Sequence, residues 1–197
     1  MKKIIFASHN ENKVEEMKSL LNGIYEVVSL TDINCFEEIE ETEDTIEGNA
    51  KLKANYITNK YGLDCFSDDS GLLIDELNGA PGVYSARYAG EPKNDLNNLN
   101  LVLKNLNNIE NRKAHFKTVI ALNLNGNTFL FEGKIEGEIS QKPIGTMGFG
   151  YDPIFIPNNY SKTFAEMDLV EKSSISHRGQ AVKQLIEFLK QQNTDNE

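Results

Sequence analysis

The sequence predicts a mixed α/β protein, in which alternating strands and helices come first and an antiparallel section follows. In the first third of the chain, short apolar runs typical of buried strands alternate with apolar residues at helical spacing. In the middle, apolar and polar residues alternate around Asn125-Gly126, a strong signal for a β-hairpin. Of the 197 residues, 39% are hydrophobic and 25% are charged, so the chain can bury a core as an ordinary globular protein does.

The first part of the chain is expected to form a βαβαβ unit. Its first helix is indicated by Val14, Met17 and Leu21, which recur at helical spacing, and its second helix stops at Gly62. The expected elements are, in order, a strand at 3–7, a polar loop at 8–13, the first helix, a strand at 25–30, an acidic loop at 35–43, a helix from about Thr45, and a strand at 63–67 that ends in a polar turn at 68–71.

The second part is expected to form a helix, an antiparallel meander and a final helix. The expected elements are a helix marked by Leu96, Leu99, Leu103 and Leu106, strands at 116–124 and 128–132 around the hairpin turn, a third antiparallel strand at 134–139, a Gly/Pro-rich segment at 143–157 and a last helix at 179–190. We expect a single domain over residues 1–190, followed by a polar, disordered tail at 191–197.

Charge and cysteine content exclude several classes of protein. The formal net charge of −10 argues against tight, sequence-blind binding to nucleic acid. No apolar run approaches the roughly 18 residues of a membrane span, and the apolar stretch near the start is too short for a secretion signal. Cys35 and Cys65 form no C-x-x-C pair, and His9, His115 and His177 lack zinc-ligand spacing. We therefore expect a cytoplasmic protein with reduced thiols.

The polar loop at 8–13 is a candidate anion site. It lies between a predicted strand and a predicted helix, where free backbone N–H groups and the helix dipole favour negative charge, and Lys13 adds a point charge. The Walker glycine pattern is absent. The alternative is a simple helix cap by Ser8 or Asn10 with a solvated lysine.

A second candidate is the pair of acids in Asp68-Asp69-Ser70-Gly71. Adjacent carboxylates repel each other unless a cation or hydrogen-bond donors accompany them. Because successive strand residues face opposite ways, one of the two could face a metal ion. The alternative is an Asx turn closed by Gly71.

Three further segments could contribute to a site. The acidic residues at 37–44 could complete an oxygen-ligand site for Mg²⁺, or could form a solvated face. The segment 145–153 combines three glycines with two aromatic residues that could stack on a base. In the segment 172–179, His177 and Arg178 are hydrogen-bond donors at a helix boundary, or Ser176 only caps the helix.

Taken together, these segments resemble the inosine triphosphate pyrophosphatase family, and most closely its bacterial branch. The resemblance runs from residue 3 to about residue 189, in one order and at similar spacing. The motifs that carry it are Ser8-x-Asn10-x-x-Lys13-x-x-Glu16, Ser67-Asp68-Asp69-Ser70-Gly71-Leu72, Gly79-Ala80-Pro81-Gly82-Val83-Tyr84-Ser85-Ala86-Arg87, Phe149-Gly150-Tyr151-Asp152-Pro153 and Lys172-Ser173-x-Ile175-Ser176-His177-Arg178-Gly179.

The resemblance implies both a fold and a reaction. The fold would be a curved mixed β-sheet forming two lobes, with helices around it and a central cleft, in a homodimer. The reaction would be hydrolysis of a purine nucleoside triphosphate (ITP, dITP or XTP) to the monophosphate and pyrophosphate with Mg²⁺. Asp69 would be the catalytic base and a metal ligand, and Glu40 the second ligand, with Glu41 as the open alternative. The substrate would contact Ser8, His9, Asn10, Glu11, Asn12, Lys13, Ser70, Phe149, Gly150, Tyr151, Asp152, Lys172, His177 and Arg178.

Two other functions are consistent with parts of the sequence. Maf-like nucleotide pyrophosphatases resemble this fold but favour pyrimidine or modified nucleotides, and the segment Ser176-His177-Arg178 argues against them. A nucleotide-binding regulatory module without catalysis is the non-enzymatic alternative. Measuring whether the protein hydrolyses ITP distinguishes these two alternatives from the purine nucleotide pyrophosphatase.

Overall fold

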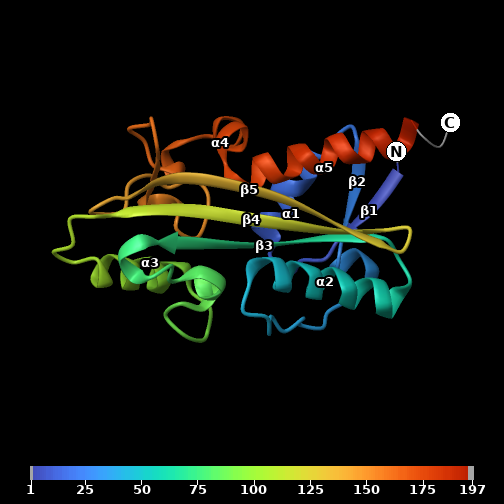
Figure 1. Cartoon of the computed structure of the whole chain (residues 1–197), viewed down its shortest axis with the longest axis horizontal. Coiled ribbons are helices and arrows are strands. Elements are labelled where there is room, and N and C mark those ends of the chain that lie inside the picture. Colours follow the sequence, from blue (N-terminus) through green and yellow to red (C-terminus); the bar gives the residue numbers. More distant parts are fainter. Residues whose placement is uncertain (1, 195–197) are drawn as a thin grey trace. The chain divides into compact units, whose positions relative to one another are not determined.

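The structure, a computed structural model, describes residues 2–194. In this part of the chain, helices accompany a six-stranded mixed sheet with the order β2-β1-β3-β4-β5-β6 (Figure 1). The expected α/β class is confirmed. The chain forms two compact units. Unit 1 comprises Met1–Asp69, Thr118–Gly133 and Arg178–Glu197, and unit 2 comprises Ser70–Lys117 and Lys134–His177. Three strands contribute residues to both units, namely β3 (Cys65–Ile74), β4 (Lys113–Leu124) and β5 (Asn127–Ile139).

Unit 1 contains the N-terminal parallel strands and three helices. β1 (Lys2–Phe6) pairs in parallel with β2 (Tyr25–Ser29) and with the start of β3. The helices are α1 (Glu11–Leu20), α2 (Ile46–Tyr61) and, from Arg178 onward, α5 (His177–Thr194). Figure 1 shows α2 and α5 on opposite sides of the sheet. Apolar residues of β1, α1 and α5 form the core on one side, including Ile4, Phe6, Met17, Val182 and Leu185.

Local sequence signals explain where these helices begin and end. The side chain of Asn10 accepts a hydrogen bond from the backbone N–H of Lys13 and caps α1, and Thr45 caps α2 in the same way. Gly62 ends α2 with a φ of 65°, in the left-handed region that glycine adopts without strain. The expected boundaries of α2 are confirmed, whereas α1 begins at Glu11, within the polar loop expected at 8–13.

Unit 2 contains α3 (Asp95–Asn105), α4 (Leu169–Ile175), β6 (Phe155–Pro157) and the remaining parts of β3, β4 and β5. β5 and β6 are antiparallel, and a Cβ at Gly137 would lie 2.3 Å from the carbonyl oxygen of Ile156, so a glycine allows this close approach. The core of this unit includes Leu72, Val102, Phe116, Phe155 and Phe164. Short 3₁₀ helices lie at Asp75–Leu77, Gly82–Arg87, Asp152–Ile154 and Phe164–Glu166, and unit 1 has one at Thr31–Ile33.

Two expectations about the strands are corrected, and one helix was not anticipated. Residues 68–71 are not a turn but the middle of β3, because β3 lies between β1 and β4 in the sheet and cations accompany its acids. The expected third antiparallel strand at 134–139 is the continuation of β5 beyond Gly133. Helix α4 was not expected, since seven residues are too few to display a helical period. The hairpin at Asn125-Gly126 is confirmed, with φ values of 50° and 77°.

The last helix is longer than the sequence indicates. α5 begins at His177 rather than Gly179 and extends to Thr194, so it includes the start of the expected tail. Residues 195–197 of that tail lie outside the described residues. Between residues 2 and 194, no helix is both long and apolar enough to cross a membrane.

Candidate active site

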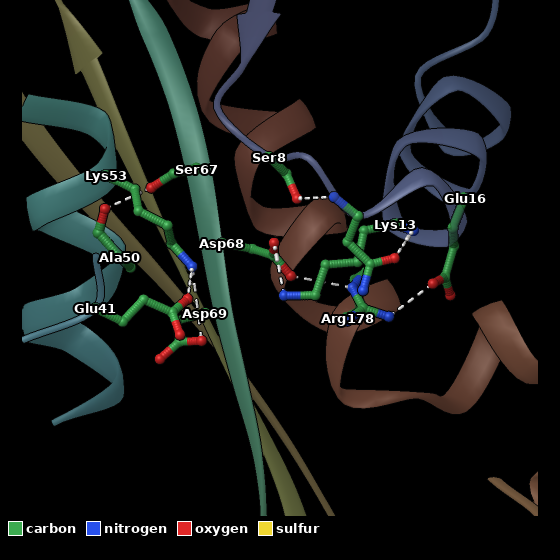
Figure 2. Close-up of polar contacts among 11 residues, drawn as sticks. Ser8, Lys13, Glu16, Glu41, Ala50, Lys53, Ser67, Asp68, Asp69 and Arg178 are labelled. Carbon is green, nitrogen blue, oxygen red and sulfur yellow. Dashed lines mark hydrogen bonds and ion pairs between the residues drawn. The ribbon is translucent and has the colours of Figure 1, made fainter. Parts of the chain in front are cut away.

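Two adjacent carboxylates lie at the centre of β3. Asp68 is fully buried and Asp69 is 5% exposed. Successive residues of a strand point to opposite faces, and Figure 2 shows the two side chains on opposite sides of β3. Each carboxylate therefore has its own set of cationic neighbours.

Asp68 is held between two cations. Its Oδ1 lies 3.1 Å from Lys13 Nζ, and its Oδ2 accepts a hydrogen bond of 3.2 Å from Arg178 Nε. Burial alone would raise the pKa of Asp68, but the charges of Lys13 and Arg178 outweigh it and hold the pKa well below its ordinary value. Arg178 is itself buried and donates from Nη1 to Glu16 Oε2 at 2.6 Å. Asp68 is therefore ionised and fixed in place.

Lys13, in the first turn of α1, extends its side chain to Asp68. Asn10 caps the helix, and the hydroxyl oxygen of Ser8 accepts a hydrogen bond of 3.2 Å from the backbone N–H of Asn10. Burial lowers the pKa of Lys13, and the nearby positive charges of Lys53 and Arg178 lower it further, while Asp68 raises it. The cap predicted from sequence is confirmed, but the lysine is not solvated. The other residues of the loop and first turn, His9, Glu11 and Asn12, are exposed.

Asp69 faces the helix α2 side of the sheet in unit 1, where Lys53 lies. Lys53 Nζ is 3.7 Å from Asp69 Oδ1 and 2.6 Å from Glu41 Oε1. Burial raises the pKa of Asp69, and the charge of Lys53 offsets this only in part. Burial lowers the pKa of Lys53, but the charges of Asp69 and Glu41 outweigh it, so the net pKa lies above the ordinary value. Asp69 is thus a buried carboxylate with increased proton affinity that lies beside the ammonium group of Lys53.

The acidic loop supplies one carboxylate to this group. Glu41 reaches Lys53, whereas Glu40 is exposed. Among the described residues, no group of three or more His, Cys, Asp and Glu side chains is arranged to hold a metal ion. Mg²⁺ is commonly bound by only one or two carboxylates, with water and substrate phosphates as its other ligands. The two carboxylates of Glu41 and Asp69, which here share one ammonium group, fit that requirement.

The glycine-rich segment of unit 2 forms a second polar group around Asp152. The carboxylate of Asp152 accepts hydrogen bonds from the backbone N–H of Phe149, at 2.9 Å, and from Lys172 Nζ, at 2.7 Å. Lys172 Nζ also lies 5.0 Å from the centre of the Phe149 ring. A Cβ at Gly148 would lie 2.0 Å from Asp152 Oδ2, so this arrangement requires glycine there. The result is an aromatic ring beside a buried lysine.

Other predicted residues of unit 2 also take defined positions. Tyr151 is buried and donates from its hydroxyl to the carbonyl oxygen of Ser85 at 2.7 Å, and the backbone N–H of Gly150 donates to Asp95. The ring of His177 is 4% exposed and stacks on Phe116 at 4.6 Å. Ser70 follows Asp69 on β3 and is half-buried.

Lys53 is the main residue that the sequence reasoning missed. A signal was present, because Lys53 falls on the apolar face of α2 defined by Ile46, Ala50 and Ile57. A charged residue at such a position is buried and must have a partner.

Comparison with known proteins agrees with these motifs. The Ham1 family matches residues 4–188. A dITP/XTP pyrophosphatase of Flavobacterium johnsoniae is 59% identical over 187 residues, which cover 95% of this chain and 97% of that protein. The solved Ham1 proteins of Staphylococcus aureus and Coxiella burnetii are 38% and 42% identical, each with a TM-score of 0.88 over 97% of this chain and 100% of the other. Because sequence and fold match over nearly the full length, this protein belongs to the Ham1 family.

Proposed function

We propose that the protein hydrolyses the deaminated purine nucleotides dITP, XTP and ITP to the monophosphate and pyrophosphate, and so removes them from the nucleotide pool. Relatives from Flavobacterium johnsoniae and Christiangramia forsetii, at 59% and 58% identity, are named dITP/XTP pyrophosphatases. The observation that carries the proposal is the pair of acids on β3. The pKa of Asp68 is lowered and that of Asp69 is raised, so the two are suited to different tasks.

Asp69 is the proposed general base. In the reaction, a water molecule attacks the α-phosphorus, its proton passes to the Asp69 carboxylate, and the bond from the α-phosphorus to the bridging oxygen breaks, which releases pyrophosphate. Lys53 contacts both Asp69 and Glu41 and thereby fixes the orientation of the base. The gain expected from such an arrangement comes from positioning and electrostatics.

Mg²⁺ is part of the proposal. Glu41 and Asp69 would hold the ion, and the contact between Glu41 and Lys53 favours Glu41 over the exposed Glu40. When bound, the ion supplies positive charge against the roughly four negative charges of a triphosphate.

Residues 8–13 are the proposed phosphate-binding segment. The N-terminus of α1 carries partial positive charge, and Lys13 adds a full charge next to it. The salt bridge to Asp68 holds the ammonium group of Lys13 in place before any ligand binds.

Residues of unit 2 are assigned to the base and the remainder of the substrate. Phe149 is suited to stack on a purine, and Lys172 and Asp152 hold it. His177 is a donor suited to the 6-keto oxygen of hypoxanthine and xanthine, whereas adenine presents a 6-amino donor there. Ser70, Gly150 and Tyr151 complete the proposed substrate contacts.

The role of Arg178 is proposed in a modified form. The resemblance places it among the substrate contacts, but its Nε and Nη1 groups donate to Asp68 and Glu16. We assign it first to holding these two carboxylates. Direct contact with substrate stays a prediction.

The remaining expectations belong to the same proposal. They are one domain over residues 1–190 with a curved, two-lobed sheet and a cleft, a homodimer, and a cytoplasmic location where the nucleotide pool lies. Light scattering after gel filtration measures the oligomeric state.

A nucleotide panel tests the function. Purified protein is incubated with Mg²⁺ and dITP, ITP, XTP, dGTP, ATP or UTP, and both the nucleotide product and pyrophosphate are measured. We expect monophosphate and pyrophosphate in equal amounts from the first three nucleotides and much less from the others. Release of inorganic phosphate with a diphosphate product, or a preference for UTP, would overturn the proposal. Nucleotide binding without turnover would indicate a regulatory module.

A further inference from the structure

The proposed ligand Glu41 lies in a loop without helix or strand. This loop, residues 35–45, connects the end of the first βαβ segment to α2 and is mostly exposed. A carboxylate on such a loop occupies one position only if other contacts fix the backbone on both sides of it. The structure gives such contacts on one face of α2.

Three residues of the loop, Glu43, Glu41 and Glu37, contact α2 in the reverse of its chain order. The backbone N–H of Glu43 donates to Asn49 Oδ1 at 3.0 Å, and Glu41 Oε1 accepts from Lys53 Nζ at 2.6 Å. Further along, the Glu37 carboxylate accepts from both Tyr56 and Lys60. As the loop residue number falls from 43 to 37, that of its partner rises from 49 to 60.

The partners are spaced so that they share one face of the helix. Positions 49, 53, 56 and 60 are separated by four, three and four residues, the period of a single helical face. Eleven residues of helix span about 16 Å, and six extended loop residues span about 20 Å. The loop can therefore run along α2 in an almost extended form, with Glu41 between two anchors.

Glu37 makes one more contact, to the phosphate-binding segment. His9 lies in the loop between β1 and α1, and its Nε2 donates to the carbonyl oxygen of Glu37 at 2.8 Å. Hydrogen bonds from Lys60 and Tyr56 lower the pKa of the Glu37 carboxyl, which keeps it ionised at neutral pH. One residue thus joins three segments of unit 1.

We propose that Glu37 is a positioning residue, which ties the acidic loop to Tyr56, Lys60 and His9 and so sets the place of Glu41 beside Lys53 and Asp69. This role rests on the proposed function, in which Glu41 and Asp69 serve the reaction. Without the side-chain contacts of Glu37, the loop is held less firmly on that side of Glu41, and it visits positions in which Glu41 leaves Lys53. The number of correctly assembled molecules then falls, while Lys13 and the N-terminus of α1, which are held by Asp68 and by the Asn10 cap, stay in place.

The test compares two variants that each remove one negative charge from the same loop. Glu37→Gln removes the charge that is paired with Lys60, and so weakens the anchor, while it keeps the shape of the side chain. Asp44→Asn is the matched control, since Asp44 is exposed and makes no hydrogen bond or ion pair to any residue between 2 and 194. Tyr56→Phe removes one of the two donors to the Glu37 carboxylate without changing the charge. Each variant is measured for kcat and KM with dITP, for amide hydrogen exchange of peptides covering 37–45, and for melting temperature.

We expect Glu37→Gln to lower kcat by about three- to tenfold with little change in KM, and to speed amide exchange in the loop. Tyr56→Phe should give a smaller effect of the same kind, and the double variant should be no worse than Glu37→Gln alone. Asp44→Asn should match the wild type in both readouts. The melting temperatures should stay within about 2 °C of one another, because the anchor is exposed.

Wild-type kcat and unchanged loop exchange in Glu37→Gln would overturn the positioning role and leave the proposed function intact. Equal losses in Glu37→Gln and Asp44→Asn would also overturn it, because a general effect of loop charge would then explain both. A wild-type protein that hydrolyses no nucleotide would instead overturn the proposed function, and this role with it.

Discussion

Replacing each acid of β3 by its amide should change stability in opposite directions. Asp68 lies between Lys13 and Arg178, and its pKa is held below the ordinary value of 3.8. An acid of this kind stabilises the folded protein at pH values above the pKa that it has in the unfolded chain. This stabilisation is lost as the pH falls toward the pKa that it has in the folded protein. The pKa of Asp69 is raised above the same ordinary value, so its ionisation opposes folding as the pH rises from about 4 through the folded pKa.

The magnitude for Asp68 follows from its burial. Its side chain is 0% exposed, and those of Lys13 and Arg178 are 14% and 3% exposed. Removing one partner of a buried ion pair lowers the free energy of unfolding by about 3–5 kcal/mol. In Asp68→Asn the amide oxygen still accepts a hydrogen bond, so we expect a loss at the lower end, about 3 kcal/mol. For a chain of this length that is a fall in melting temperature of about 6–12 °C. Asp69→Asn mimics the protonated acid, which folding favours, so its melting temperature should be equal to or above that of the wild type.

Melting curves at pH 8 without Mg²⁺, followed by turnover of dITP with Mg²⁺, measure both effects. Asp69→Asn should lower kcat by about 10²-fold or more, as expected when a general base is lost, although the protein is no less stable. The difference in melting temperature between Asp69→Asn and the wild type should shrink as the pH is lowered toward 4. A lower melting temperature in Asp69→Asn than in Asp68→Asn at pH 8 would refute the assignment of the two environments. A mild kinetic effect in Asp69→Asn with a severe one in Asp68→Asn would move the base to Asp68.

Three further predictions concern other buried side chains. Lys53→Met should lower kcat by about tenfold or more. Because the charge of Lys53 lowers the pKa of Asp69, the same variant should shift the acidic limb of the pH profile of kcat/KM to higher pH, and an acidic limb at the wild-type pH would contradict the prediction. Arg112 donates to the carbonyl oxygens of Leu106, Ile139 and Ser140. Arg112→Met should leave these acceptors unsatisfied and lower the melting temperature by at least about 6 °C, and an unchanged melting curve would refute this prediction. Burial raises the pKa of Cys65 to about 11, so iodoacetamide at pH 8 should label this thiol far more slowly in native than in denatured protein, with equal rates as the contrary result.

Local signals in the sequence predicted much of the fold. Asn10, Thr45 and Gly62 define helix ends through contacts or conformations within a few residues, and Asn125-Gly126 defines a hairpin in the same way. These features depend on short-range backbone chemistry, so the sequence is sufficient to predict them. The family motifs in the sequence likewise indicated the reaction and the importance of the two acids at 68 and 69.

The polar turn expected at 68–71 shows where local reasoning fails. Two adjacent acids with Ser70 and Gly71 have strong turn propensity, yet they continue a strand. Pairing and buried cations from distant parts of the chain outweigh that propensity, and the partners of Asp68 come from 55 and 110 residues away. Short-range preferences amount to fractions of a kcal/mol, whereas burying an unpaired charge costs several.

The sequence by itself therefore determined the class of fold, the ends of α2, the family and the identity of the acids on β3. The tertiary structure decided which acid is neutralised and which has increased proton affinity, that Lys53 joins Glu41 to Asp69, and that Glu37 lies on the face of α2. The physical reason is that the pKa of a buried group depends on its desolvation and on charges that only folding brings within a few ångströms.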